Sequence, residues 1–161
     1  MGATKEQLAT AAQVYQDFCV TMDEMGWKYR KNAEKLEIET GAKGDDLTIE
    51  LTIKVDAERQ VVTVLSHLPY VIDKEKRIDA VVAVSVINNS LVHGCVDYVP
   101  TDGHVFFRMT NSYLDSKLDK EVYKYLLLCS CTTIDNFNDK LLLLSKGMIN
   151  INQFIELYNK K

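Results

Sequence analysis

The clearest pattern in the chain is the strict alternation of apolar and polar residues from Leu47 to Asp56. A period of two with one polar face is typical of a strand in an antiparallel sheet that has one side in water. The segments 35–40 and 61–68 also have the alternation or the β-branched composition of strands. Short loops separate these three segments, so the pattern predicts an antiparallel meander.

A different period, of three to four residues, runs through the first part of the chain. Thr4 and Gln7 fit a capping box, in which each side chain binds a free backbone N–H group of the other residue. Gly26 can take the left-handed conformation that ends a helix. The pattern therefore predicts an amphipathic helix before Gly26, with an apolar stripe that consists of Leu8, Ala11, Tyr15, Phe18, Met22 and Met25.

The segment 74–93 predicts a second helix, with Asp73 as its N-cap and Gly94 just past its end. Its many β-branched residues are unusual in a helix, because branching at Cβ restricts the side-chain rotamers there. In helical projection one face is formed by Ile78, Val81, Val82, Ser85, Asn89 and Val92.

The last part of the chain returns to a helical period. Asp119 can cap a long helix that reaches Lys146. A break near 132–133 would divide this helix into two, and both alternatives stay open. A short last helix is predicted from 153 to 158, with Asn152 as its cap.

Two short apolar segments, 95–99 and 104–109, flank the turn residues of 100–103 and predict a hairpin. The order along the chain is then helix, three strands, helix, two strands, and one or two helices. We therefore predict an α+β fold with a five-stranded antiparallel sheet, helices on one side of it, and a single domain that spans 1–161.

Composition and charge narrow the class of protein. The 161 residues are 47% hydrophobic and 26% charged, which is typical of a globular domain. The formal net charge is −4, and the densest basic stretch is the short segment Lys28–Lys31. A nucleic-acid surface needs clustered Lys and Arg, so we expect no nucleic-acid partner.

The cysteines and the apolar runs bear on the cellular compartment. No run of apolar residues is long enough to cross a membrane, and the first residues lack the apolar core of a signal peptide. The cysteines at 19, 95, 129 and 131 are scattered through apolar segments. We therefore expect a cytoplasmic protein with free thiols and no membrane partner.

His93, Cys95, Asp97 and His104 are the residues that could form a metal or catalytic site. Zinc sites usually show pairs of closely spaced ligands, and these residues do not have that spacing. We interpret His93 as a helix-end residue and Cys95 as a core thiol. A small enzyme or metal-binding protein that uses Cys95, Asp97 and His104 is the alternative hypothesis, which metal analysis would test.

The known motifs for nucleotide binding and nucleophilic catalysis are missing from the chain. It has no G-x-x-x-x-G-K-[ST], no G-x-G-x-x-G and no G-x-S-x-G. The glycines of 41–46 precede a predicted strand, so no helix N-terminus presents N–H groups to a phosphate there. We therefore predict no cofactor, no metal and no enzymatic activity.

The segment 87–109 contains a characteristic series of residues: Asn88 or Asn89, Gly94, Asp97, Gly103, Phe107 and Arg108. Through them it resembles the YbjN family of bacterial proteins, which have a type III secretion chaperone-like (Tir chaperone-like) fold. The predicted order of elements is also similar over nearly the whole chain. The resemblance implies a small acidic cytoplasmic protein that forms homodimers, holds an extended or partly folded segment of a partner, and has no catalytic residues.

The two strands of the predicted hairpin are apolar on both faces. One face must cover the core, and the other would be an apolar patch for a partner or a second subunit, unless further helices cover it. The first hypothesis is therefore a non-enzymatic protein-binding module, a chaperone-like protein or regulatory adaptor, that is also a homodimer. Its predicted partner face consists of Val96, Tyr98 and Phe106, opposite Cys95, Val99, Val105 and Phe107.

Overall fold

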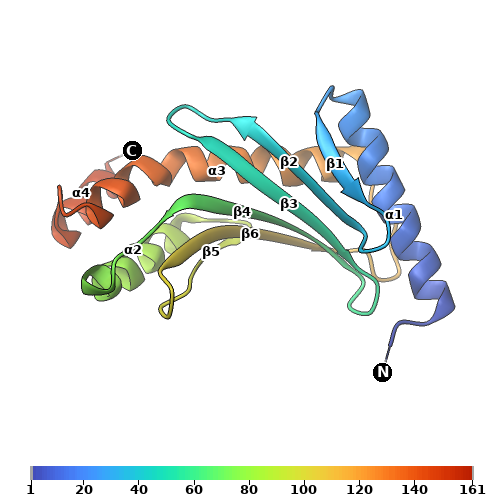
Figure 1. Ribbon diagram of the computed structural model, residues 1–161, viewed down its shortest axis with the longest axis horizontal. Coiled ribbons are helices and arrows are strands. Elements are labelled where there is room, and N and C mark those ends of the chain that lie inside the picture. Colours follow the sequence, from blue (N-terminus) through green and yellow to red (C-terminus); the bar gives the residue numbers. More distant parts are fainter. Residues whose placement is uncertain (1, 161) are drawn as a thin grey trace.

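The computed structural model describes residues 2–160, and its centre is one antiparallel sheet of six strands. The strands lie in the order β1-β2-β3-β4-β6-β5, so a hairpin extends the meander through the pairing of β6 with β4 (Figure 1). Their bounds are β1 Tyr29–Asn32, β2 Glu37–Lys43, β3 Thr48–Asp56, β4 Val61–Val71, β5 Cys95–Tyr98 and β6 His104–Ser112.

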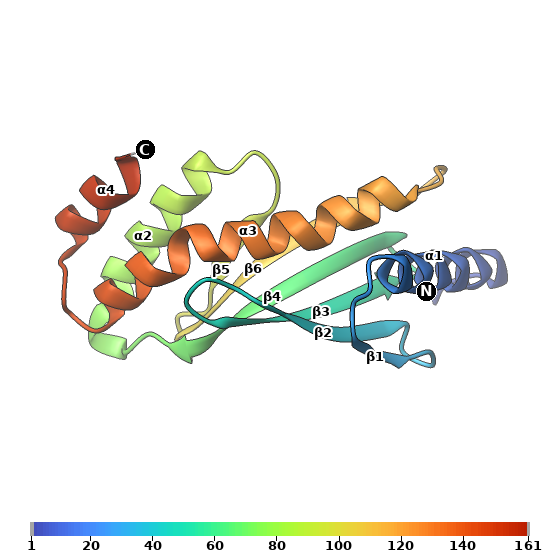
Figure 2. The same ribbon diagram turned by 90° about the horizontal axis from the view of Figure 1, so that it is seen from above.

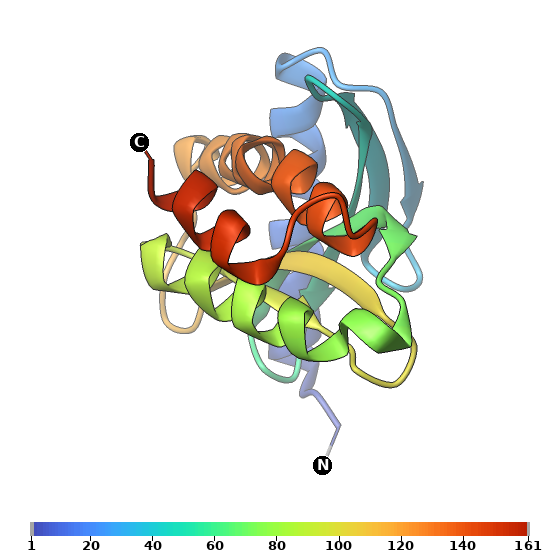
Figure 3. The same cartoon turned by 90° about the vertical axis from the view of Figure 1, so that its left-hand side faces the viewer.

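The helices lie on one face of this sheet. α3 (Lys120–Ser145) runs along the sheet, and α1 (Lys5–Glu24) crosses the β1 end, where it contacts α3 and β3 (Figure 2). Figure 3 shows α2 (Arg77–Ser90) and α4 (Ile151–Asn159) side by side at the other end. No helix within residues 2–160 covers the opposite face. The predicted α+β fold with helices on one side is therefore confirmed.

The sheet has six strands and not the predicted five, because β1 pairs with β2. β1 is four residues long and carries Arg30 and Lys31, so it shows no apolar alternation. Its anchor is Tyr29, whose hydroxyl donates a hydrogen bond of 2.9 Å to Asp23 of α1. β2 also continues to Lys43, through residues that were predicted to form a loop.

The alternation of β3 decides which of its residues form the core, as predicted. Ile49, Leu51 and Ile53 are at most 1% exposed, whereas the polar residues between them face water. The predicted helix at the start of the chain is also confirmed, with the capping box of Thr4 and Gln7 in place. Its stripe is buried apart from its two ends, since Leu8 is exposed and Met25 is partly exposed.

The second helix is shorter than predicted. A 3₁₀ turn, η1 (Lys74–Lys76), precedes α2, and the side chain of Asp73 makes no capping hydrogen bond. α2 ends at Ser90, four residues before Gly94. Residues 91–94 therefore form a separate connection to β5, which ends with Gly94 at a φ of +75°.

α2 packs through its small residues. Ala80 and Ala83 are buried together with Ile87, and α2 contacts β5, α3 and α4. Because α2 is apolar on all sides, its sequence pattern could not identify the side that faces the core. The residues that helical projection groups on one face lie on the exposed side, with exposed fractions of 74% for Ile78, 47% for Val81 and 38% for Val82.

The C-terminal helices answer the question that the sequence left open. α3 is one continuous helix across 132–133, and Asp119 caps it by accepting hydrogen bonds from two main-chain N–H groups. α4 begins at Ile151, because Asn150 and Gln153 form a capping box and Asn152 does not cap it. Within residues 2–160, no helix combines the length and the apolarity needed to cross a bilayer.

Candidate functional site

The hairpin β5–β6 has a register that the sequence did not predict. Residues directly opposite each other in an antiparallel pair point to the same face of the sheet. Val96 and Tyr98 therefore share the helix-covered face with Phe107, and Val96 is buried there. The Cα partners are Cys95 with Arg108, Val96 with Phe107, Asp97 with Phe106, and Tyr98 with Val105.

The prediction that Val96, Tyr98 and Phe106 share a partner face is thus wrong in its geometry. The alternation within each strand was right, but the turn between the strands sets their offset, and a slip of one residue moves a side chain to the other face. Of the three residues, only Phe106 points to the uncovered face of the sheet. The alternative, that a helix covers the other two, holds for Val96, since α2 packs against β5.

Two of the residues that carried the resemblance have structural roles: Asn88 joins α2 to β5, and Gly94 lies close against β6. Asn88 accepts a hydrogen bond of 2.7 Å from the N–H of Val96 and donates one of 2.9 Å to its carbonyl. A Cβ at Gly94 would come within 2.5 Å of the ring of Phe107. The side chain of Asn88 therefore replaces a neighbouring strand at the outer edge of β5.

Cys95 and Asp97 lie together on the uncovered face, but Arg108 joins them where the alternative hypothesis needs His104. Arg108 donates hydrogen bonds of 2.8 Å to Asp97 and 3.2 Å to the Cys95 sulfur. Burial raises the pKa of the Cys95 thiol, and the charge of Asp97 raises it further. The charge of Arg108 opposes part of this shift, but the net direction is upward, and a thiol with a raised pKa is a weaker nucleophile and metal ligand.

The described residues do not bring together a metal site. In the part of the chain from 2 to 160, no group of three or more His, Cys, Asp and Glu side chains is placed to hold an ion. His93 instead contacts α3, where its Nδ1 lies 2.7 Å from the hydroxyl of Tyr125. The thiols of Cys129 and Cys131 are free and partly buried on α3, and burial raises the pKa of Cys131 to about 11.

The uncovered face of the sheet is the candidate site. One row of neighbours crosses it from β2 to β5 and consists of Gly41, Glu50, His67, Phe106 and Asp97. The ring of His67 lies 5.3 Å from that of Phe106, measured between centroids. Leu65, in the next row, is a diagonal neighbour of Phe106, and both side chains are half-buried. This apolar patch of Leu65, His67 and Phe106 lies on β4 and β6.

Ion pairs lie on the same face, on both sides of the apolar patch: two on β1 to β3 and one between β5 and β6. The distances between charged atoms are 2.9 Å for Arg30–Glu39, 3.2 Å for Lys54–Glu37 and 2.8 Å for Arg108–Asp97. Each of these cations therefore has an acidic neighbour on the same face. A surface of this kind has no continuous basic stripe, which binding to a phosphate backbone would need.

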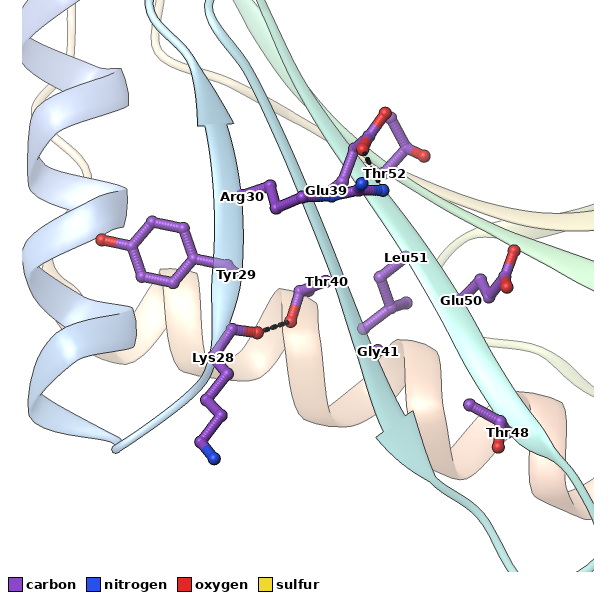
Figure 4. A pocket seen from close by; sticks show the side chains of 10 residues that line it. All are labelled: Lys28, Tyr29, Arg30, Glu39, Thr40, Gly41, Thr48, Glu50, Leu51 and Thr52. Atoms are coloured by element: carbon purple, nitrogen blue, oxygen red, sulfur yellow. Dashed lines mark hydrogen bonds and ion pairs between the residues drawn. The ribbon is translucent and has the colours of Figure 1, made fainter.

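A hollow of about 550 Å³ lies over β1, β2 and β3, at the other end of the same face (Figure 4). Gly41 contributes no side chain to this hollow. The rim of the hollow carries Arg30 and Glu39 on one side and Glu50 on the other. The hydroxyl of Thr40 is used by a hydrogen bond to the carbonyl of Lys28. The lining contains neither His nor Cys. It offers the hydroxyl groups of Tyr29 and three threonines, the amine of Lys28 and the carboxylates of Glu39 and Glu50, all of which can bind polar groups.

Sequence reasoning found Phe106 but missed its neighbours. The alternation of 61–68 already places Leu65 and His67 on one face, opposite Val62 and Val64. That signal could have indicated both residues as surface groups. Their position beside Phe106 could not be predicted, because it depends on the pairing of β4 with β6, which are far apart in the sequence.

Comparison with known proteins supports the fold. No family model matches the chain, and no curated protein matches it. Among solved structures, the chain is similar to YbjN from E. coli, a proposed transcription regulator, with a TM-score of 0.56 and 10% sequence identity. The similarity covers 75% of this chain and 85% of the other. It confirms a YbjN-like fold, whereas membership of that family stays a prediction.

Proposed function

We propose that this protein is a non-enzymatic adaptor that binds another protein on the uncovered face of its sheet. The observation that carries the proposal is that α1 to α4 all pack on one face, while the other presents the patch of Leu65, His67 and Phe106. Half-buried apolar groups within a polar, charged rim are typical of protein contact surfaces. The expected partner surface is apolar at its centre and charged around it.

The chemistry of the face supports binding and not catalysis. Burial and the charge of Asp97 raise the pKa of the Cys95 thiol, and the lining of the hollow over Gly41 contains neither His nor Cys. The paired charges also argue against a role on DNA or RNA. If the protein is a regulator, as was proposed for its structural neighbour, we expect it to act through protein contacts. The free thiols fit the predicted cytoplasmic location.

The predicted homodimer is a separate part of the proposal. We place its contact on the exposed face of α2, formed by Ile78, Val81 and Val82. No residue from Ala80 to Ser90 is charged, which is unusual for a helix face in water and usual for a subunit contact. Light scattering of the wild type and of Val81→Glu tests this. A dimer that becomes a monomer in the variant supports the contact, and a monomeric wild type contradicts it.

The adaptor proposal is tested by recovering bound proteins with tagged protein from the source cells. Phe106→Glu introduces a charge into the centre of the patch, so the partner recovered with the wild type should be lost. Leu128→Glu is the matched control, because Leu128 is 52% exposed on α3, a helix that packs on the covered face. The proposal fails if Phe106→Glu recovers the partner as well as the control does.

A further inference from the structure

A second binding feature lies at the edge of the sheet, beside β6. The ladder between β5 and β6 ends with the pair Cys95–Arg108, whereas the ladder between β4 and β6 continues to Val61–Ser112. In the described part of the chain, β6 therefore has a strand on one side only from Met109 to Ser112. We call these four residues the open edge of β6.

Gly94 is the reason that β5 does not continue along this edge. Its φ of +75° turns the chain out of the extended conformation one residue before Cys95. A Cβ at Gly94 would lie 2.9 Å from the carbonyl oxygen of Arg108, so the turn is pressed against β6 and leaves no room for another residue type. The open edge is thus fixed by the backbone.

The main chain of Thr110 points into the open edge. The carbonyl of His104 accepts a hydrogen bond of 2.8 Å from the N–H of Val99, at the end of the hairpin. The even-numbered residues of β6 therefore direct their N–H and C=O groups toward β5, because these directions alternate along an antiparallel strand. By the same alternation, the N–H and C=O groups of Thr110 point away from β4. They point to the side of β6 on which no described strand pairs with Thr110.

The other edges of the sheet are protected, which makes this one distinct. Asn88 binds both main-chain groups of Val96 at the outer edge of β5. β1 is short and carries Arg30 and Lys31. Covered or charged edges prevent unwanted pairing with other chains. Within residues 2–160, no side chain binds both main-chain groups of an open-edge residue as Asn88 does for Val96, and the open-edge residues are uncharged: Met109, Thr110, Asn111 and Ser112.

A groove of about 540 Å³ runs between the open edge and the first turns of α3. Met109 and Leu126 are buried beneath it, while Val122 and Tyr125 are more accessible on its α3 side. The ring of His93 meets Tyr125 edge-on, with 5.6 Å between the centroids. The groove therefore combines free main-chain groups on one side with apolar and aromatic groups on the other, and Asp119 and Glu121 also line it at the start of α3.

We propose that this groove binds an extended segment of a partner protein, which adds to the sheet as a strand beside β6. Such a segment would satisfy the main-chain groups of Thr110 and place every second side chain against Val122 and Tyr125. Four residues of β6 offer about 13 Å of pairing at ~3.3 Å per residue, so the segment is short. The inference rests on the proposed adaptor function and adds to the contact on the uncovered face a second contact, made by a partner segment with alternating apolar residues.

A second copy of this chain does not fit the groove. The groove is bounded by β6 on one side and by α3 on the other. The same edge of another copy lies beside that copy's own α3, so pairing through it would bring a second helix against the α3 that bounds the groove. The partner segment must therefore be free of neighbouring structure on both of its sides, as an extended peptide is.

The test uses a phage-displayed library of seven-residue peptides, selected on the full chain. Selected peptides should have apolar residues at every second position and should shift the amide resonances of Thr110 and Tyr125 in the labelled protein. Thr110→Pro removes the N–H that faces the groove and leaves the pairing with β4, so affinity should fall at least tenfold. Thr110→Val is the matched control, because it also loses the hydroxyl contact with Thr63 but keeps the N–H; its affinity should change less than twofold.

Tyr125→Ala is a second test that leaves the strand intact, since Tyr125 is 45% exposed on α3. It should lower affinity for the same peptides about fivefold, the loss expected for part of one aromatic contact. The inference is overturned if no peptide is selected, if Thr110→Pro binds as well as Thr110→Val while both remain folded, or if the peptides shift only resonances of the uncovered face. Because Phe106→Glu leaves this groove unchanged, failure here and failure of the adaptor proposal are separable.

Discussion

Neighbouring residues of one strand lie on opposite faces of the sheet, and the two faces differ in whether helices cover them. In β6, Val105, Phe107 and Met109 are at most 3% exposed beneath the helices. Phe106 and Arg108, which lie between them, face the side without helices. The covered face is therefore constrained by packing, whereas the uncovered face is constrained by little that the fold itself needs.

This difference indicates where function should be sought. The covered face contributes the buried apolar residues that the fold requires, and their substitution would leave cavities. The uncovered face has an apolar patch that no helix uses, together with ion pairs that contribute little to stability at exposed positions. Residues that a fold does not need, and that do not resemble an ordinary polar surface, are the candidates for partner contact.

The largest expected effect separates two adjacent phenylalanines. Phe107→Ala should destabilise the protein by about 3–5 kcal/mol, because it removes a fully buried ring. Phe106→Ala, the same change one residue away on the uncovered face, should cost less than about 1 kcal/mol. Urea denaturation monitored by circular dichroism measures both. Equal losses would show that the uncovered face is part of the core and would break the comparison.

The next effect concerns the edge that α2 protects. Asn88→Ala leaves the N–H and C=O of Val96 without their partner, at a cost of about 1–3 kcal/mol. Asn89→Ala is the matched control, since Asn89 is exposed on the same helix and should change stability by no more than about 0.5 kcal/mol. If both variants unfold at the same urea concentration, the side chain of Asn88 does not replace a strand.

A smaller effect tests the chemistry of the uncovered face. Asp97→Asn removes a negative charge that raises the pKa of the Cys95 thiol, although burial remains the larger cause. More of the thiol should then be ionised at pH 8, so alkylation of Cys95 by iodoacetamide should be several-fold faster. Mass spectrometry resolves Cys95 from the other cysteines. An unchanged rate would show that Asp97 does not control this thiol.

The smallest effect is a change in pH dependence at His67. Burial lowers the pKa of His67 and the nearby His104 lowers it further, against a smaller opposite effect of Glu50. The folded protein thus binds the proton more weakly than the unfolded chain, whose histidine pKa is about 6.5. Above that pH His67 is neutral in both states and has no effect on the free energy of unfolding. As the pH falls through it toward the folded pKa, the unfolded chain binds the proton first, so the free energy of unfolding declines.

His67→Gln should therefore lose less stability than the wild type between pH 7.5 and pH 5. Because His67 is largely exposed, we expect the difference to be no more than about 2 °C in melting temperature. Thermal unfolding at a series of pH values measures it. An identical decline in both proteins would mean that the surroundings of His67 do not disfavour its charged form.

The sequence predicted most of the fold because its signals are local. The alternation around Ile49, the capping box at Thr4 and the cap at Asp119 each depend on residues that are close in the chain. β1 was missed because its four residues are mostly polar and it is stabilised by pairing with β2 and by Tyr29. Its existence depends on contacts that only the folded chain provides.

The candidate site was harder to predict for the same reason. The partner face named from the sequence joined Val96 and Tyr98 to Phe106, and the hairpin register separates them. The patch beside Phe106 is completed by Leu65, from a strand that precedes α2. On α2 the apolar residues surround the helix, so packing of Ala80 and Ala83, and not periodicity, decides which side is buried. Tertiary pairing supplies what the local pattern does not specify.

The most direct test of the adaptor proposal places a photo-crosslinking amino acid at position 106 or, as a control, at position 128 of the full-length protein. Irradiation in the source cells should join position 106 to one or a few defined proteins, whereas position 128 should give none of these products. Both sites are accessible, but only the first lies on the uncovered face. Identical products from both positions, or no product from position 106, would contradict the account.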